Sequence, residues 1–255
     1  MTTTYRLEDL IKQGLQDFYQ RRIDSLKGLD LRKTLTRKNP YLFRATGVQQ
    51  ASEIVQELLR AYISSSDETI FGDAFFEPIA KIVSGGQAGG GEGIDILKET
   101  GNRVVAISVK SGPNWANSSQ KRRQKQDFEQ VRQRLLKTHK AFDALLGYGY
   151  GRKYSDPEKD RPYRERSGQA FWEELTGDPD FYLKLIRLMK DYPPQHRRLY
   201  KKEWNRSVNR FEREFLQDFS TEAGDIDWEK LAEFNSSRQR PPRAGRRSSK
   251  TPSAS

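Results

Sequence analysis

Asp95 and Lys110 are charged residues within otherwise apolar segments of the chain. Burying a charge costs free energy, and proteins tolerate that cost mainly where the charge is paired or binds a metal ion. A carboxylate can fix a divalent cation that polarises a phosphate and lowers the pKa of a bound water. A nearby lysine can orient that water and offset the negative charge of the transition state. The pair therefore points to hydrolysis of a phosphodiester.

Two short strands are expected to position this pair. The sequence predicts strands at 93–97 and 104–110, joined by a tight turn at 99–102. Because side chains alternate along a strand, Asp95 falls on one face of the first strand and Lys110 shares a face with Ser108 on the second. A suitable hairpin register would bring both within reach of one ion or phosphate. Sequence alone leaves that register open.

The composition limits the kinds of catalytic site that the chain could build. It has no cysteine, which excludes thiolate zinc sites, iron–sulfur clusters, disulfides and thiol catalysis. Its two histidines, His139 and His196, lie in basic helical surroundings, which argues against catalytic triads and multi-histidine metal centres. Any bound metal should then be hard and oxygen-ligated, such as Mg²⁺ or Mn²⁺.

The net charge of +11 favours a polyanionic partner. Residues 237–255 carry six of the basic residues and no acid, and are expected to form a disordered basic tail. Without them, 40 basic residues face 35 acidic ones, a net charge of +5. A moderately basic body suits an enzyme that binds DNA through a local cleft. No long apolar run or signal-peptide pattern is present, so we expect a soluble, cytoplasmic protein without a membrane partner.

Hydrophobic periodicity predicts the remaining elements. Helices are expected at 5–26, 48–64, 67–83, 118–139, 168–176, 179–191, 194–219 and 227–235. Ser66 or Asp67 is the expected N-cap of the third of these helices. Residues 27–46 suggest a short helix followed by an extended segment around Pro40.

Other segments connect these helices or add to the sheet. Residues 85–91 are glycine-rich and suggest a flexible connector, residues 142–150 a third strand, and residues 151–166 a charged loop. The order of elements predicts an α/β protein, a mixed sheet core flanked by helices with N- and C-terminal helical additions. We expect a single domain over 1–236, divided into N-terminal helices (5–83), a catalytic core (84–150) and a C-terminal helical part (151–236).

The hairpin motif resembles a known family. Gly93-Ile94-Asp95 with Ser108-Val109-Lys110 resembles the metal-binding core of the PD-(D/E)XK nuclease superfamily. The segments KNPYLFR (38–44), ETIFG (68–72) and SVKSGPNW (108–115) are similar to a group of type II restriction endonucleases, and the similarity spans roughly residues 5–190. The resemblance implies a restriction-endonuclease-like fold, with Asp95 as metal ligand, Lys110 as catalytic lysine and the Val109 carbonyl as a further ligand.

The motif departs from the superfamily at one position. An acid usually stands two residues before the lysine, where this chain has Ser108, and a neighbouring helix is expected to supply the missing carboxylate. The candidates are Glu77, Glu68, Asp127 and Glu129. Glu77 ranks first because its neighbours are apolar, which favours a metal-paired carboxylate. Glu68 is the second choice as a metal ligand, and its alternative role is a charge at a helix N-terminus.

Several residues after the second strand are candidates for DNA contacts. They are Ser111, Asn114, Trp115 and Asn117 in the following loop, Ser119, Gln120, Lys121 and Arg122 at the start of the basic helix, and Arg152 and Lys153 in the charged loop. Polar and basic side chains in such positions commonly contact phosphates. The alternatives are ordinary helix capping, a packed tryptophan, a solvated helix face and a mobile solvent loop.

The resemblance implies a Mg²⁺-dependent type II restriction endonuclease that cuts both strands of a specific DNA site, with Mn²⁺ as a possible substitute. A palindromic site matches two-fold symmetry, so a homodimer is expected. A cognate DNA methyltransferase is expected in the same prokaryotic system, though not as a bound subunit. The alternatives are a structure-specific repair or junction nuclease of the same superfamily, and a non-catalytic DNA- or RNA-binding protein, which the Ser108 departure leaves open.

Overall fold

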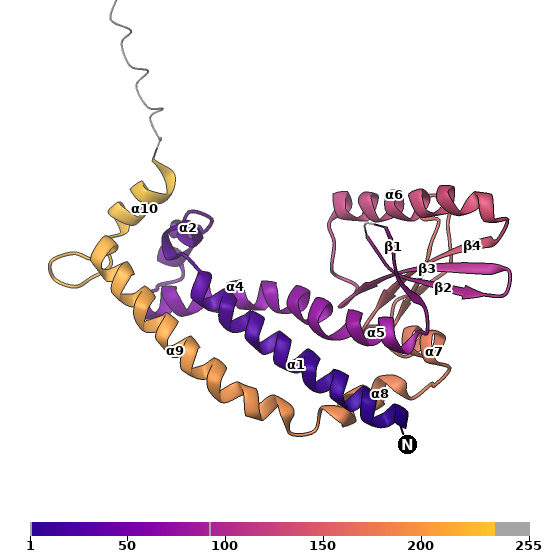
Figure 1. Ribbon diagram of the computed structural model, residues 1–255. Coiled ribbons are helices and arrows are strands. Elements are labelled where there is room, and N and C mark those ends of the chain that lie inside the picture. Colours follow the sequence, from indigo (N-terminus) through magenta and orange to yellow (C-terminus); the bar gives the residue numbers. More distant parts are fainter. Residues whose placement is uncertain (1, 92, 238–255) are drawn as a thin grey trace, which may run out of the picture. The chain divides into compact units, whose positions relative to one another are not determined.

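The computed structural model describes residues 2–91 and 93–237 (Figure 1). The predicted disordered tail, apart from its first residue, lies outside these residues. The chain divides into two compact units, one of Met1–Leu29 with Leu59–Asn209 and the other of Asp30–Leu58 with Arg210–Ser255. The predicted single domain over 1–236 stays a prediction. No helix among the described residues is long and apolar enough to cross a membrane.

The first unit contains a six-stranded mixed sheet with strand order β1-β2-β3-β4-β6-β5. The strands are β1 (Gln87–Gly91), β2 (Ile94–Thr100), β3 (Arg103–Lys110), β4 (Ala141–Tyr148), β5 (Tyr154–Ser155) and β6 (Arg164–Ser167). The pairs β1–β2, β2–β3 and β5–β6 are antiparallel, whereas β3–β4 and β4–β6 are parallel. The mixed sheet flanked by helices confirms the predicted fold class.

Helices cover both faces of this sheet. The unit contains α1 (Thr2–Gly28), the later part of α4 (Ala51–Phe71), a π-helical turn η1 (Gly72–Phe76), α5 (Glu77–Val83), α6 (Ser118–Leu135), a 3₁₀ turn η2 (Leu136–Thr138), α7 (Gln169–Thr176), α8 (Phe181–Met189) and the first part of α9 (Tyr192–Phe219). Figure 1 shows α6 along one face of the sheet, with α5 and α7 on the opposite side.

Two apolar clusters hold these layers together. On one face, Ile107 and Leu145 belong to the cluster that contains Phe75 and Trp172 from the helices, all of them 0–1% exposed. On the other face, the strand residues Ala106, Ala144 and Leu146 pack with Phe128 and Val131 of α6. Neighbouring residues of one strand therefore serve opposite cores, as the two-residue period of a strand requires. Burial on both faces fixes the register of the central strands.

The second unit is helical. It contains α2 (Leu31–Leu35), α3 (Pro40–Ala45), the beginning of α4, the end of α9 and α10 (Trp228–Ser236). The Asn235 side-chain amide donates to the carbonyls of Leu35 and Lys38 at 2.9 and 2.8 Å, which ties α10 to the end of α2. Arg32 forms an ion pair with Asp218 at 2.9 Å.

The expected extended segment at Pro40 and the expected helix start at Ser66 or Asp67 were wrong. The segment at Pro40 is the helix α3, because proline is tolerated in the first turn and the Asn39 side chain accepts hydrogen bonds from the Tyr41 and Leu42 N–H groups. No helix begins at Ser66 or Asp67, since α4 continues to Phe71. The Ser66 hydroxyl donates back to the Tyr62 and Ile63 carbonyls.

Two predicted connections contain strands. Part of the expected flexible connector at 85–91 is the edge strand β1. Gly86, directly before this strand, lies close to β2, because a Cβ on Gly86 would lie 2.6 Å from the Ile96 side chain. The expected charged loop at 151–166 contains β5 and the start of β6. Glu165 holds this segment by accepting hydrogen bonds from Tyr148 at 2.7 Å and Ser155 at 2.8 Å.

Candidate active site

The β2–β3 hairpin brings Asp95 against the end of β3. Ile96 pairs with Ile107 in the antiparallel register, so Asp95 comes beside Ser108 and Val109. One Asp95 carboxylate oxygen accepts a hydrogen bond from the Val109 N–H at 2.7 Å, and the Ser108 hydroxyl donates to the same oxygen at 3.4 Å. The Asp95 side chain is thus held by the backbone of the neighbouring strand β3.

The π-helical turn η1 carries two further acids towards the hairpin. Asp73 lies within the turn and Glu77 begins α5 directly after it. The turn approaches β3 closely, because a Cβ on Gly72 would lie 3.2 Å from the Ser111 backbone nitrogen. Single π-turns inside helices are frequent at functional sites. Glu77 forms an ion pair with Lys81, one turn further along α5.

The charges of these groups act on Asp95. Burial raises the pKa of the Asp95 carboxyl, and the negative charge of Glu77 adds to the rise. The Val109 N–H and the positive charges of Lys110 and Lys81 lower this pKa without cancelling the rise. The protein alone therefore stabilises the ionised form of Asp95 poorly, and a nearby cation would stabilise it.

Asp73 experiences the same surroundings. Burial raises the pKa of its carboxyl and Glu77 adds to the rise, whereas Arg21 and Lys110 oppose it. Lys110 thus acts electrostatically on both Asp73 and Asp95, and its ammonium group lies 5.2 Å from the centre of the Trp115 ring. Two lysines, Lys110 and Lys81, act on the acids in this corner of the fold.

Ser108 occupies the usual position of the missing acid and is fully buried. Its hydroxyl lies 3.1 Å from the side-chain oxygen of Gln124 on α6, and the Gln124 amide donates to the Gly93 carbonyl at 3.0 Å. Gln124 thereby connects the start of β2 with the end of β3 on either side of Asp95. A buried polar network with its partners satisfied holds a unique arrangement of side chains.

Glu68 lies at a second position beside the hairpin. Its carboxylate accepts hydrogen bonds from the Ser111 hydroxyl at 2.9 Å and the Tyr150 hydroxyl at 3.2 Å. Glu68 also lines a pocket of about 320 Å³ that Asp73, Lys110 and Ser111 share. These contacts indicate that Glu68 supports the loop after β3. Its role as a metal ligand stays a prediction.

The residues predicted to contact DNA occupy two groups. Ser111, Asn114, Trp115 and Gln120 line the same pocket as Lys110. Asn117 is the N-cap of α6, where it forms a capping box with Gln120 and accepts hydrogen bonds from Ser119.

Lys121 and Arg122 follow on the exposed side of α6, while Arg152 and Lys153 are exposed before β5. Lys153 lies 3.6 Å from Glu165. Capping is therefore observed at Asn117, and DNA contact stays a prediction for the whole set.

The donor atoms suit a hard divalent cation. Asp73, Glu77, Asp95 and the Val109 carbonyl offer only oxygen, and Mg²⁺ commonly binds one or two carboxylates and completes its shell with water and substrate phosphate. In the described part of the chain, no three acids or histidines are arranged as a ready metal cluster. The residues therefore fit an ion held by few protein ligands, and Glu77 pairs with Lys81 through one of its two carboxylate oxygens.

A comparison with protein families identifies the relatives of this chain. The family model of the type II restriction endonuclease EcoO109I matches residues 5–195. The chain belongs to this family. No curated protein matches it. The matched range includes Asp95, Lys110 and Glu77 together with every predicted DNA contact, and the resemblance expected over residues 5–190 is confirmed. The protein is therefore an endonuclease that binds DNA, from a class of enzymes that generally use divalent metal ions.

Three residues beside the candidate site have little or no signal in the sequence. Asp73 approaches Lys110 only through the π-helical turn, which no hydrophobic period reveals. Lys81 is visible in part, because it stands four residues after Glu77 on a predicted helix. Gln124 has a weak signal: it shares a face of α6 with Phe128 and Val131, so a polar residue occupies a core position.

Proposed function

We propose that this endonuclease hydrolyses phosphodiesters of double-stranded DNA at a specific site with Mg²⁺, for which Mn²⁺ can substitute. The observation that carries the proposal is the meeting of Asp95 with the end of β3, where the Val109 N–H holds its carboxylate at 2.7 Å and Lys110 follows. Glu77 adds negative charge beside both Asp95 and Asp73. These groups lie within the range matched to the restriction endonuclease family.

Each residue of the proposed site has a distinct task. Asp95, Glu77 and the Val109 carbonyl would hold the metal ion, which would polarise the scissile phosphate and lower the pKa of a bound water. Lys110 orients the attacking water and offsets charge that develops on the phosphate. Ser108 takes no part as an acid, and its single hydroxyl proton can be donated to either Gln124 or Asp95. The carboxylate usual at that position is supplied in this proposal by Glu77.

The assembly follows from the same proposal. A site with two-fold symmetry is cut on both strands most simply by a homodimer, because each copy then faces one strand. A methyltransferase that protects the same site would belong to the same restriction–modification system. Size measurement of the purified protein with and without DNA checks the dimer.

Cleavage of phage DNA in Mg²⁺ tests the proposal. Asp95→Asn keeps an oxygen that can accept from the Val109 N–H but removes the charge, and Lys110→Ala removes the ammonium group. We expect wild-type protein to give discrete fragments, and each variant to cut at least about 100-fold more slowly while still binding DNA. The matched controls are Glu222→Ala and Lys230→Ala, both exposed in the second unit.

Other results would select other functions. Undiminished cutting by Asp95→Asn would contradict the assigned site. A preference of the wild type for branched DNA would identify a repair or junction nuclease. Binding without cleavage in both Mg²⁺ and Mn²⁺ would identify a non-catalytic nucleic-acid-binding protein.

A further inference from the structure

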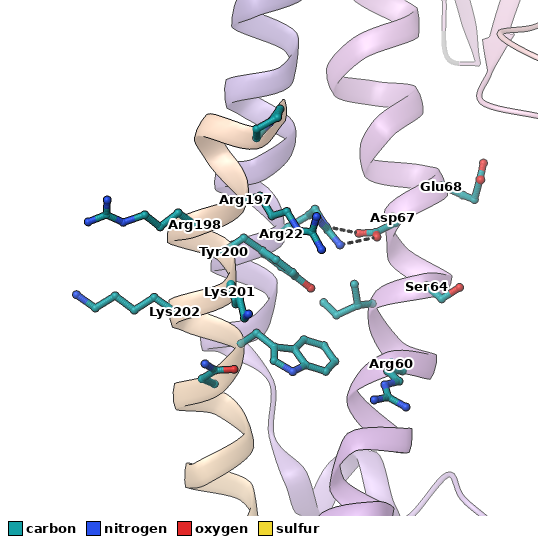
Figure 2. Close-up of a pocket in the computed structure, with 14 residues that line it drawn as sticks. Arg22, Arg60, Ser64, Asp67, Glu68, Arg197, Arg198, Tyr200, Lys201 and Lys202 are labelled. Carbon is teal, nitrogen blue, oxygen red and sulfur yellow. Dashed lines mark hydrogen bonds and ion pairs between the residues drawn. The ribbon is translucent and has the colours of Figure 1, made fainter. Parts of the chain in front are cut away.

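A large basic cavity lies in the first unit between α1, α4 and α9, separate from the Asp95 carboxylate. Its volume is about 1190 Å³, above the roughly 300–1,000 Å³ typical of small-molecule pockets. Figure 2 shows its lining side chains. The basic members are Arg22, Arg60, Arg197, Arg198, Lys201 and Lys202, and the acidic members are Asp67 and Glu68.

Both acids of this cavity already have partners. Asp67 accepts two hydrogen bonds from the Arg22 guanidinium at 2.8 and 2.9 Å. Glu68 accepts from the hydroxyls of Ser111 and Tyr150. The positive charge that α9 contributes is therefore not neutralised from within the cavity.

The four basic residues that α9 contributes to the cavity are exposed, and they stand at 197, 198, 201 and 202. In the described part of the chain none of them forms a salt bridge. Arg197 and Lys201 point from α9 towards the space facing α4, while Arg198 and Lys202 extend from another side of the helix (Figure 2). Residues four apart on a helix are separated by about 6 Å along its axis, comparable with the separation of neighbouring phosphates on one DNA strand. The pattern suits a row of phosphates better than a single anion.

Aromatic and apolar groups line the cavity between these charges. The Arg22 guanidinium lies 3.9 Å from the centre of the Tyr200 ring, and the Tyr200 and Trp204 ring centres are 6.4 Å apart. Ile63 and Pro194 complete the apolar part of the lining. Basic groups interleaved with aromatic ones can contact both the phosphates and the sugars or bases of a nucleic acid.

The cavity adjoins the candidate active site at α4, where the two share one lining residue. Glu68 lines this cavity and also the 320 Å³ pocket that holds Asp73 and Lys110. A nucleic acid lying at Lys110 can therefore extend past α4 to the basic face of α9. A free nucleotide would need no such connection.

We propose that this cavity binds the sugar–phosphate backbone of DNA flanking the site of cleavage, with Arg197 and Lys201 contacting phosphates. The inference rests on the DNA-cleaving function proposed for Lys110 and Asp95, and it adds a second contact region to it. DNA long enough to reach α9 binds more tightly than DNA that covers the catalytic pocket alone. The added affinity is electrostatic and decreases as salt concentration rises.

Fluorescence anisotropy with two labelled duplexes tests the proposal. One duplex has about 10 base pairs, or one helical turn, and the other about 40. For the long duplex we expect Arg197→Ala/Lys201→Ala to weaken binding about 10-fold and to reduce the slope of log K against log salt by about 1.8, the value for two phosphate contacts. Binding of the short duplex should stay within a factor of two of the wild type.

Three controls accompany this measurement. Arg213→Ala/Lys230→Ala removes two exposed basic residues in the second unit and should change neither duplex. Arg197→Lys/Lys201→Arg keeps both charges and should restore the salt slope. Thermal unfolding of each variant shows whether the fold is intact.

The outcomes separate this inference from the proposed function. An unchanged long-duplex affinity and salt slope in Arg197→Ala/Lys201→Ala would overturn the inference. Saturable displacement of the long duplex by inorganic triphosphate at low concentration, lost in the same variant, would instead assign the cavity to a small polyanion and also overturn it. If wild-type protein shows the expected binding but does not cut phage DNA in Mg²⁺, the proposed function fails and the second contact region stands.

Discussion

At the scale of single residues, the site depends on side chains that hold Asp95 as well as on those that react. Asp95 accepts from the Val109 N–H, and the Ser108 hydroxyl lies within hydrogen-bond distance of both Asp95 and Gln124. The usual acid at position 108 would put a further negative charge beside a carboxyl whose pKa is already raised by burial. A serine there avoids that repulsion, provided that Gln124 satisfies its hydroxyl.

Gln124→Leu tests this arrangement. The variant leaves the Ser108 hydroxyl and the Gly93 carbonyl without their partner on α6, which should cost about 1–3 kcal/mol of stability. We expect the single-turnover rate of plasmid cleavage to fall about 10- to 100-fold, as for other residues that orient metal ligands, with DNA affinity little changed. The conservative control is Gln130→Leu, an exposed position on the same helix. Equal rates in the two variants would remove Gln124 from the site.

At the scale of elements, the π-helical turn between α4 and α5 determines which acids lie near Asp95. A regular helix through 72–76 would turn Asp73 and Glu77 to other directions, whereas the π-turn adds a residue to the turn and redirects α5. Gly72 allows this turn to lie against the end of β3.

Gly72→Ala should therefore disturb catalysis more than stability. The added Cβ would lie 3.2 Å from both the Ser111 Cβ and its backbone nitrogen, so the turn or the strand end must shift by a few tenths of an ångström. We expect cleavage to fall about 10-fold or more, because small displacements of positioned groups are costly to rate. Gly28→Ala provides the comparison, since a Cβ there meets nothing within 4 Å. If both variants cut at the wild-type rate, the joint does not position the acids.

Sequence could predict the hairpin and α6 because each carries a strong local period. Alternation along β3 placed Lys110 and Ser108 on one face, and Asp95 indeed meets Ser108. It could not predict the uninterrupted α4, since Asp67 resembles a helix cap and its actual partner, Arg22, is 45 residues away. Glu77 is the first candidate because of its apolar neighbours, but its path to Asp95 depends on a π-helical joint and on packing against the sheet, which no local period reveals.

At the scale of the whole molecule, the two units differ in secondary structure and in the proposed functional residues that they contain. The first holds the sheet and every proposed catalytic residue, and the regular elements of the second, up to residue 237, are helices. In the second unit, Phe211, Phe215 and Phe219 are almost fully buried along α9. A chain with two cores need not unfold in one cooperative step.

Phe215→Ala should destabilise the second unit selectively. Phe215 is fully buried and its ring centre lies 5.3 Å from that of Phe219, so truncation should cost about 3–5 kcal/mol. Hydrogen exchange followed by mass spectrometry should show faster exchange in peptides from 30–58 and 210–237, with peptides from 93–148 unchanged, because local opening follows local stability. Leu216→Ala, at a neighbouring position that is 42% exposed, should leave exchange nearly unaltered. Equal loss of protection in both sets of peptides would instead show that the two units unfold together, and cleavage would then be lost with the second core.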